Sequence, residues 1–74
     1  MAKAKATDSV YRVTELIGSS PTSWEDAAKR AVETASKTLR ELRVAEIAEL
    51  DMVVENGKVA AYRAKVKLSF KYQP

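Results

Sequence analysis

The stretch from residue 51 to residue 70, DMVVENGKVAAYRAKVKLSF, decides the fold. Asn56-Gly57 separates two strand-like runs, residues 44–55 and 58–72, and this dipeptide favours the type I′ turn of a β-hairpin because both central residues need positive φ. The second run alternates, with apolar side chains at the even positions from 60 to 72 and mainly charged or polar ones between them. The sequence therefore predicts a hairpin whose second strand turns one apolar face towards a core.

The first strand of this hairpin carries two acids at positions that need an explanation. With a two-residue loop, the simplest register places Asp51 opposite Tyr62 and Glu49 opposite Ala64, on the side expected to be core. Burying two carboxylates in a small core would be costly. We therefore expect a bulge or bend near Glu49–Asp51, or a site at which these acids reach solvent, a cation or a neighbouring subunit.

Upstream of the hairpin, the chain predicts one further strand and one helix. Residues 10–17, VYRVTELI, are rich in strand formers, and the GSSP segment at residues 18–21 should end the strand. A capping box at Thr22 and Glu25 starts a helix that should run from about Ser23 to about Leu42. The predicted fold class is α+β, in the order β-α-β-β, with a three-stranded antiparallel sheet wrapped around one helix. The apolar stripe of the helix consists of Trp24, Ala28, Ala31, Ala35, Leu39 and Leu42, widened by Ala27 and Val32.

Length and composition limit the kinds of protein that this chain can be. We expect one domain, residues 9–74 of 74, preceded by a disordered tail at residues 1–8. The chain has no Cys and no His, which excludes disulfides, thiolate metal sites and His-based catalysis. A core this small and this rich in alanine favours oligomerisation. Neither a secretory signal nor an apolar run of membrane-spanning length is found, so a cytoplasmic location is expected.

Several segments, in this order and spacing, resemble the dodecin family. They are YRVTELIGSSPTSWEDAAKRAV at residues 11–32, ASKTLRELRVAEI at residues 35–47, and the final strand YRAKVKLSF at residues 62–70. The resemblance covers about residues 9–72. It implies a hollow homo-dodecamer in which each sheet wraps its own helix, and a binding or storage role rather than turnover.

The resemblance also bears on flavin binding. In flavin-binding dodecins a Trp at the start of the second strand stacks on the isoalloxazine ring, and a Gln in the third strand hydrogen-bonds its polar edge. Those positions fall on Val44 and Arg63 here, with Ala45 and Glu46 beside the first. Val44 offers no stacking platform, so the resemblance implies weakened or lost flavin binding. The alternative is a riboflavin or FMN binder with an altered pocket around these four residues.

The segment RVAEIAELDM at residues 43–52 resembles the non-flavin dodecins that include the calcium dodecins. Calcium takes six to eight oxygen ligands, several of them from carboxylates. Glu49 and Asp51 lie two residues apart on one strand, so both side chains can share a face and are the candidate metal ligands. The competing explanation is an acid pair that is solvated or bound in ion pairs, with Arg63 or with Arg12 of another subunit.

The sequence favours a binding protein over an enzyme or a nucleic-acid binder. It contains no nucleophile–base pair built on His or Cys, no glycine-rich phosphate loop and no metal-hydrolase spacing, so no catalytic residue is assigned. The basic row Arg63, Lys65, Lys67 and Lys71 lacks interleaved aromatic side chains, and pairing with acids such as Glu46 explains it better. The predicted function is non-enzymatic storage of a small ligand or cation. A structural or protein-interaction module is the remaining alternative.

Overall fold

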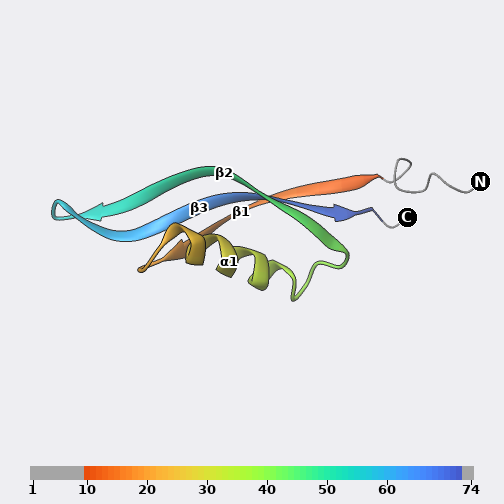
Figure 1. The fold of residues 1–74 in the computed structure, drawn as a ribbon, viewed down its shortest axis with the longest axis horizontal. Coiled ribbons are helices and arrows are strands. Elements are labelled where there is room, and N and C mark those ends of the chain that lie inside the picture. Colours follow the sequence, from red (N-terminus) through yellow and green to blue (C-terminus); the bar gives the residue numbers. More distant parts are fainter. Residues whose placement is uncertain (1–9, 73–74) are drawn as a thin grey trace, which may run out of the picture.

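The computed structural model describes residues 10–72, which form a three-stranded antiparallel sheet and one helix. The elements follow the order β1 (Tyr11–Ser20), α1 (Trp24–Ala35), β2 (Leu42–Glu55) and β3 (Lys58–Lys71). In the sheet the order is β1-β3-β2, so the last strand is central (Figure 1). The α+β class and the β-α-β-β order predicted from the sequence are confirmed. The predicted tail at residues 1–8 lies outside the described residues.

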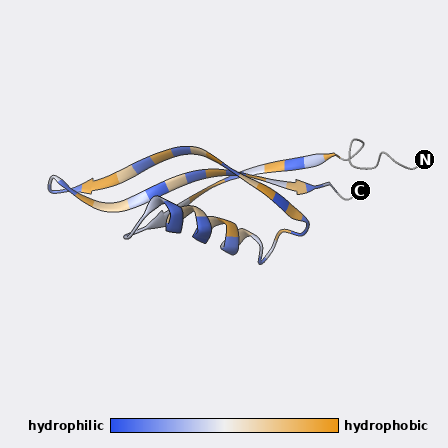
Figure 2. Ribbon diagram, in the orientation of Figure 1, coloured by the Kyte–Doolittle hydropathy of each residue, from blue (hydrophilic) through white to orange (hydrophobic). Residues whose placement is uncertain are grey.

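The hairpin between β2 and β3 turns at the predicted dipeptide. Asn56 has φ 53° and Gly57 has φ 75°, the two positive angles that a type I′ turn requires. Apolar and polar residues alternate along both strands (Figure 2). The hairpin reaches beyond the end of α1, which makes the molecule elongated, with extents of 60 × 20 × 16 Å (Figure 1).

The uniform register predicted for this hairpin is wrong over its middle. Register shifts occur between Ile47 and Glu49 and again between Val53 and Val54, so a bulge flanks the acidic segment on each side. The bulges move Glu49 opposite Lys65 and Asp51 opposite Arg63, on the face turned away from α1. The expected irregularity near these acids is therefore confirmed, and its effect is to keep both carboxylates out of the core.

Strand β1 does not end at residue 17 as predicted but continues to Ser20. Gly18 pairs with Ala64 and lies against the backbone of α1 at Ala27. A Cβ added at Gly18 would stand 2.0 Å from the carbonyl oxygen of Ala27. This glycine thus serves close packing of helix on sheet, not a turn, because only a residue without a side chain leaves the helix enough room.

The helix is shorter than predicted at both ends. Its N-cap is Ser23 rather than Thr22, with the Ser23 hydroxyl accepting from the backbone N–H of Asp26 at 3.0 Å. It ends at Ala35, and Leu42, predicted as its last residue, lies in β2 opposite Phe70. Residues 36–41 reverse the chain so that β2 can pair along β3, and pairing across the sheet prevails over the helical spacing of the apolar residues.

The core lies between α1 and the two strands that it covers, β1 and β3. Strand β2 remains largely uncovered on the same face, with Ile47 48%, Leu50 50% and Met52 45% exposed. The helix of 12 residues is too short to cross a membrane, and it is the one helix in the described part of the chain. The buried apolar residues are Ala27, Ala31, Ala35, Ala64, Val66 and Leu68.

Candidate functional site

The face of the sheet turned away from α1, called the outer face below, carries the predicted metal ligands. Along β2 this face presents acids, and along β3 it presents bases in register with them. Opposite charges on neighbouring strands attract across the short distance between paired residues. The outer face is thus a charge-matched surface rather than a free basic row. The pairs from β2 to β3 are Glu46 with Lys67, Glu49 with Lys65, and Asp51 with Arg63.

Asp51 and Arg63 form the tightest of these pairs. The guanidinium donates two hydrogen bonds, Nε to Oδ1 and Nη2 to Oδ2, each 2.7 Å long. These hydrogen bonds, and then the charge of Arg63, hold the pKa of Asp51 below its usual value, and they raise the pKa of Arg63. Both carboxylate oxygens of Asp51 are therefore engaged within the chain. The ion pair with Arg63 is one of the two alternatives considered for this acid.

Glu49 is more open than Asp51. Its carboxylate lies 3.9 Å from the ammonium of Lys65, which is also 4.0 Å from Glu15 of β1, and 71% of the Glu49 side chain is exposed. Long ion pairs of this kind contribute little, because solvent screens them. Within residues 10–72, no group of three acidic, His or Cys side chains is placed to hold a metal ion. One chain thus brings two acids onto one face but does not supply the six to eight oxygens of a calcium site.

The residues at the flavin-pocket positions do not come together within one chain. Val44 lies on the outer face opposite Ser69 and is 54% exposed. Arg63 lies on the same face but six residues away along β3, which is about 20 Å. Ala45 turns to the helix side, whereas Glu46 faces outward opposite Lys67. A pocket that used Val44 and Arg63 jointly would need a second copy of the chain.

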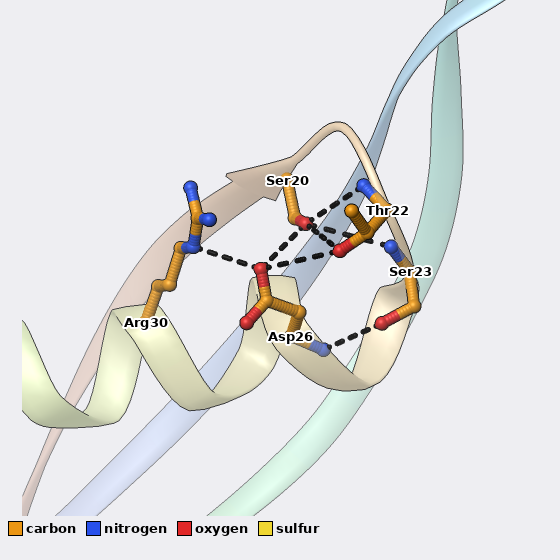
Figure 3. A network of polar contacts seen from close by, with 5 residues as sticks. All are labelled: Ser20, Thr22, Ser23, Asp26 and Arg30. Carbon is orange, nitrogen blue, oxygen red and sulfur yellow. Dashed lines mark hydrogen bonds and ion pairs between the residues drawn. The ribbon is translucent and has the colours of Figure 1, made fainter.

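A network of polar side chains closes the connection between β1 and α1, just after the GSSP segment that was expected to end the strand (Figure 3). Ser20, 1% exposed, donates to Asp26 Oδ2 at 2.6 Å and accepts from the backbone N–H of Thr22 at 3.0 Å. Asp26 also forms an ion pair with Arg30 at 2.8 Å, as its i,i+4 spacing indicates. The Ser20 hydrogen bond is the main reason why the pKa of Asp26 lies below its usual value. No buried side-chain nitrogen or oxygen in residues 10–72 lacks a hydrogen-bond partner, and this network holds the end of β1 against the start of α1.

The indole of Trp24 links the helix to the edge strand, a contact that no sequence pattern indicated. Its Nε1 donates to the backbone carbonyl of Asp51 at 2.9 Å, and its ring meets that of Tyr62 edge-on, with centroids 5.2 Å apart. Beside it, a groove of about 370 Å³ separates α1 from β2, lined by Ala28, Ile47 and Leu50 among others. An open apolar groove of this kind is typical of an interaction surface.

Comparison with known proteins identifies the family that shares this architecture. The profile of the dodecin family matches residues 10–73. The chain is 47% identical to the calcium dodecin of Mycobacterium tuberculosis over 66 residues, which cover 89% of this chain and 93% of that protein. The dodecin of Streptomyces coelicolor superposes with a TM-score of 0.85 at 37% identity, covering 92% of this chain and 97% of that one.

A second solved structure extends the comparison. The calcium dodecin of M. tuberculosis, described as calcium chelating and as having a novel calcium-binding site, superposes with a TM-score of 0.77 at 48% identity. That match covers 88% of this chain and 93% of the other. The match to the family profile over all the described residues, the identity to a curated relative and the common fold agree. The chain belongs to the dodecin family.

Proposed function

We propose that this protein is a non-enzymatic binding and storage dodecin that assembles as a homo-dodecamer and takes up a small ligand or a cation, with calcium the leading candidate. The observation that carries the proposal is that one chain is incomplete. The apolar inner face of β2 is uncovered, and the two candidate calcium ligands do not form a full site. Further copies of the chain would complete both.

The first support is the small size of the core. Of its six buried apolar residues, four are alanines, which bury little apolar area each. In contrast to these small buried side chains, one strip of β2 keeps three large apolar side chains about half exposed, namely Ile47, Leu50 and Met52. Domains of this length commonly need an additional source of stability. Burying this strip between copies would provide it, and dodecameric assembly is what the family resemblance implies.

Calcium is favoured by the identity of 47% to a calcium dodecin and by the placement of Glu49 and Asp51 on the outer face. Because Glu49 and Asp51 supply only part of the six to eight oxygens that calcium takes, and both have basic partners on β3, we expect further ligands to come from other copies of the chain. Calorimetry should detect heat when calcium is added to the metal-free assembled protein. Glu49→Gln should reduce this heat most, and Asp51→Asn should reduce it less because Arg63 already engages both Asp51 oxygens, whereas Glu55→Gln, at the hairpin turn, should leave it unchanged.

Flavin binding is expected to be weak or absent, because Val44 cannot stack on an isoalloxazine ring. An aromatic side chain that stacks on a base contributes about 1–3 kcal/mol of binding free energy in nucleic-acid-binding proteins. A flavin pair that loses one stacking side chain on each side should lose correspondingly more binding free energy. Riboflavin fluorescence should therefore remain unquenched on titration with this protein. Quenching, or a yellow protein on purification, would instead favour the altered pocket around Val44 and Arg63.

Native mass spectrometry of protein purified without added ligand tests the proposal as a whole. A twelve-chain species that gains mass as calcium ions are added would support it. A stable monomer in dilute solution would refute the assembly. A dodecamer that takes up neither calcium nor flavin would reject the storage role and leave a structural or protein-interaction module.

A further inference from the structure

We propose that Trp24 is a positioning residue for the two acids of the outer face. Its indole holds the backbone of Asp51 from the helix side of the sheet, in the register that turns the Glu49 and Asp51 carboxylates outward. The inference rests on the proposed function, because it concerns the same two acids as the calcium site. It adds to them a residue that lies on the opposite face and acts through the backbone of β2.

The two acids lie in a short segment of β2 whose pairing is displaced by one residue. Ala48 of β2 and Ala60 of β3 have no partner in the register, and they mark the two bulges on either side of Glu49–Val53. Outside the bulges, at residues 44–47 and 54–55, the pairing is the one that the two-residue turn sets. A slide of the displaced segment by one residue would leave the rest of the hairpin unchanged. It would also exchange the faces of the segment and turn both acids towards α1.

A hydrogen bond from the helix opposes this slide. The Nε1 of Trp24 donates to the backbone carbonyl of Asp51, in the middle of the displaced segment, at 2.9 Å. No other hydrogen bond among residues 10–72 joins α1 to β2. A slide of one residue would move this carbonyl by about 3.3 Å along the strand, which is farther than a hydrogen bond can stretch. The indole therefore favours the register in which both acids face outward.

The same indole contacts the strand that carries the basic partner. Its ring meets that of Tyr62 edge-on, with centroids 5.2 Å apart, and Tyr62 directly precedes Arg63 in β3. On the outer face, the Arg63 guanidinium binds both carboxylate oxygens of Asp51. Trp24 thus connects β2 to β3 on the inner face where Asp51 and Arg63 connect them on the outer face. When a cation takes the Asp51 carboxylate from Arg63, the outer connection opens and the inner one remains.

The start of α1 gives the indole a fixed position. Trp24 is the first residue of the helix and directly follows its N-cap, Ser23. The buried Ser20 hydroxyl accepts from the backbone N–H of Ser23 at 3.4 Å and donates to Asp26 at 2.6 Å (Figure 3). The polar network between β1 and α1 therefore also holds the residue that contacts β2. A site whose parts are held before the ligand arrives loses less entropy on binding.

Intrinsic fluorescence of the wild-type protein gives the first test, because Trp24 is the only tryptophan of the chain. Calcium should change the emission of Trp24, and the midpoint of this change should coincide with that of the calorimetric heat. Asp51→Asn should remove most of the change in emission, because the effect reaches the indole through the backbone of residue 51. Glu55→Gln, at the hairpin turn, should leave the change as it is in the wild type.

Calorimetry of variants separates positioning from stability. Trp24→Phe keeps an aromatic ring but loses the N–H, and it should weaken calcium binding about fivefold. Ser36→Ala is the matched control, because it removes a side-chain hydrogen bond of 3.0 Å to a backbone carbonyl at the other end of α1. It should change the calcium affinity by less than about twofold. Removing Ala48 and Ala60 together makes the outward register the uniform one, so Trp24→Phe should no longer weaken calcium binding in that background.

The possible results distinguish this inference from the proposed function. Calcium heat without a change in Trp24 emission, or a weakening below about twofold in Trp24→Phe, would overturn the inference alone. Equal weakening by Trp24→Phe with and without the two bulge alanines would also overturn it, because the indole would then act on stability and not on register. The fluorescence titration uses the wild-type protein, so it decides the matter even where a variant fails to fold. Absence of calcium heat in the wild type would reject the proposed function, and this inference with it.

Discussion

Replacing Gly18 with alanine is the most demanding test of how the helix packs on the sheet. The new Cβ would meet the carbonyl oxygen of Ala27 at 2.0 Å, the carbonyl carbon at 2.9 Å and the Cβ of Ala31 at 3.1 Å. The first two atoms belong to the helix backbone, so no side-chain rotation can relieve the contact. The helix must retreat from β1, or β1 must leave its place in the sheet.

The cost follows from the size of that retreat. Reaching even the shortest tolerable contact requires a movement of about 1 Å, and a gap of that size forfeits a quarter to a half of the dispersion energy between facing atoms. Overpacking of this kind costs about 1–3 kcal/mol, and a backbone clash belongs at the upper end of that range. Lower entropy of the unfolded chain offsets up to about 1 kcal/mol. We expect a net loss of about 2 kcal/mol, or a decrease in Tm of about 8–16 °C.

Thermal unfolding followed by circular dichroism, at one protein concentration for all variants, measures this decrease. Gly57→Ala is the matched control. It places the same methyl group in the hairpin turn, where no atom lies within 4 Å and only the positive φ of 75° is unfavourable, so about 1 kcal/mol is expected. The reasoning fails if Gly18→Ala unfolds within about 2 °C of the wild type, or if it is less destabilising than the control.

Three further outcomes follow from other contacts. The hydrogen bond from Ser20 lowers the pKa of Asp26 below 3.8, so the ionised carboxylate stabilises the fold above that pH, and this contribution is lost as the pH falls through the lowered pKa. When the free energy of unfolding is measured in urea over a series of acidic pH values, Asp26→Asn should make it depend less on pH. An unchanged pH dependence would contradict this. Trp24→Phe should lower the free energy of unfolding in urea by about 1 kcal/mol, because the hydrogen bond to the Asp51 carbonyl is lost while the aromatic contact with Tyr62 is kept. No measurable loss would mean that this hydrogen bond does not contribute to stability. Leu50→Asp places a charge on the uncovered face of β2 and should shift sedimentation towards smaller species, and an assembly of unchanged size would exclude that strip from the interface.

The bidentate pair between Asp51 and Arg63 has a consequence for ligand binding. Because the guanidinium engages both carboxylate oxygens at 2.7 Å, a cation that approaches this face meets Asp51 already neutralised. Glu49, whose ion pair is 3.9 Å long, is the more available acid. Arg63→Gln would free Asp51, and its effect on calcium uptake would separate a metal ligand from a structural ion pair.

Local pattern alone determined the hairpin, the two faces of β3 and the order of elements. Asn56-Gly57 has few alternatives to a type I′ turn, and alternation with a period of two is a property of a single strand. The expectation of a bulge near the acids came from the same kind of reasoning, since a uniform register would have buried two carboxylates.

Tertiary structure decided what depends on contacts between segments distant in the sequence. The helix ends at Ala35 although its apolar spacing continues to Leu42, because pairing along β3 takes the later residues into β2. From the sequence alone, Gly18 is predicted to end a strand. Only the position of Ala27 against it in the folded structure shows that it allows the helix to pack closely on the sheet. Asp51 pairs with Arg63 because two bulges shift the register of β2 against β3. A one-residue shift exchanges the faces of a strand, so the partners of a charged residue follow from the whole sheet and not from its neighbours in the chain.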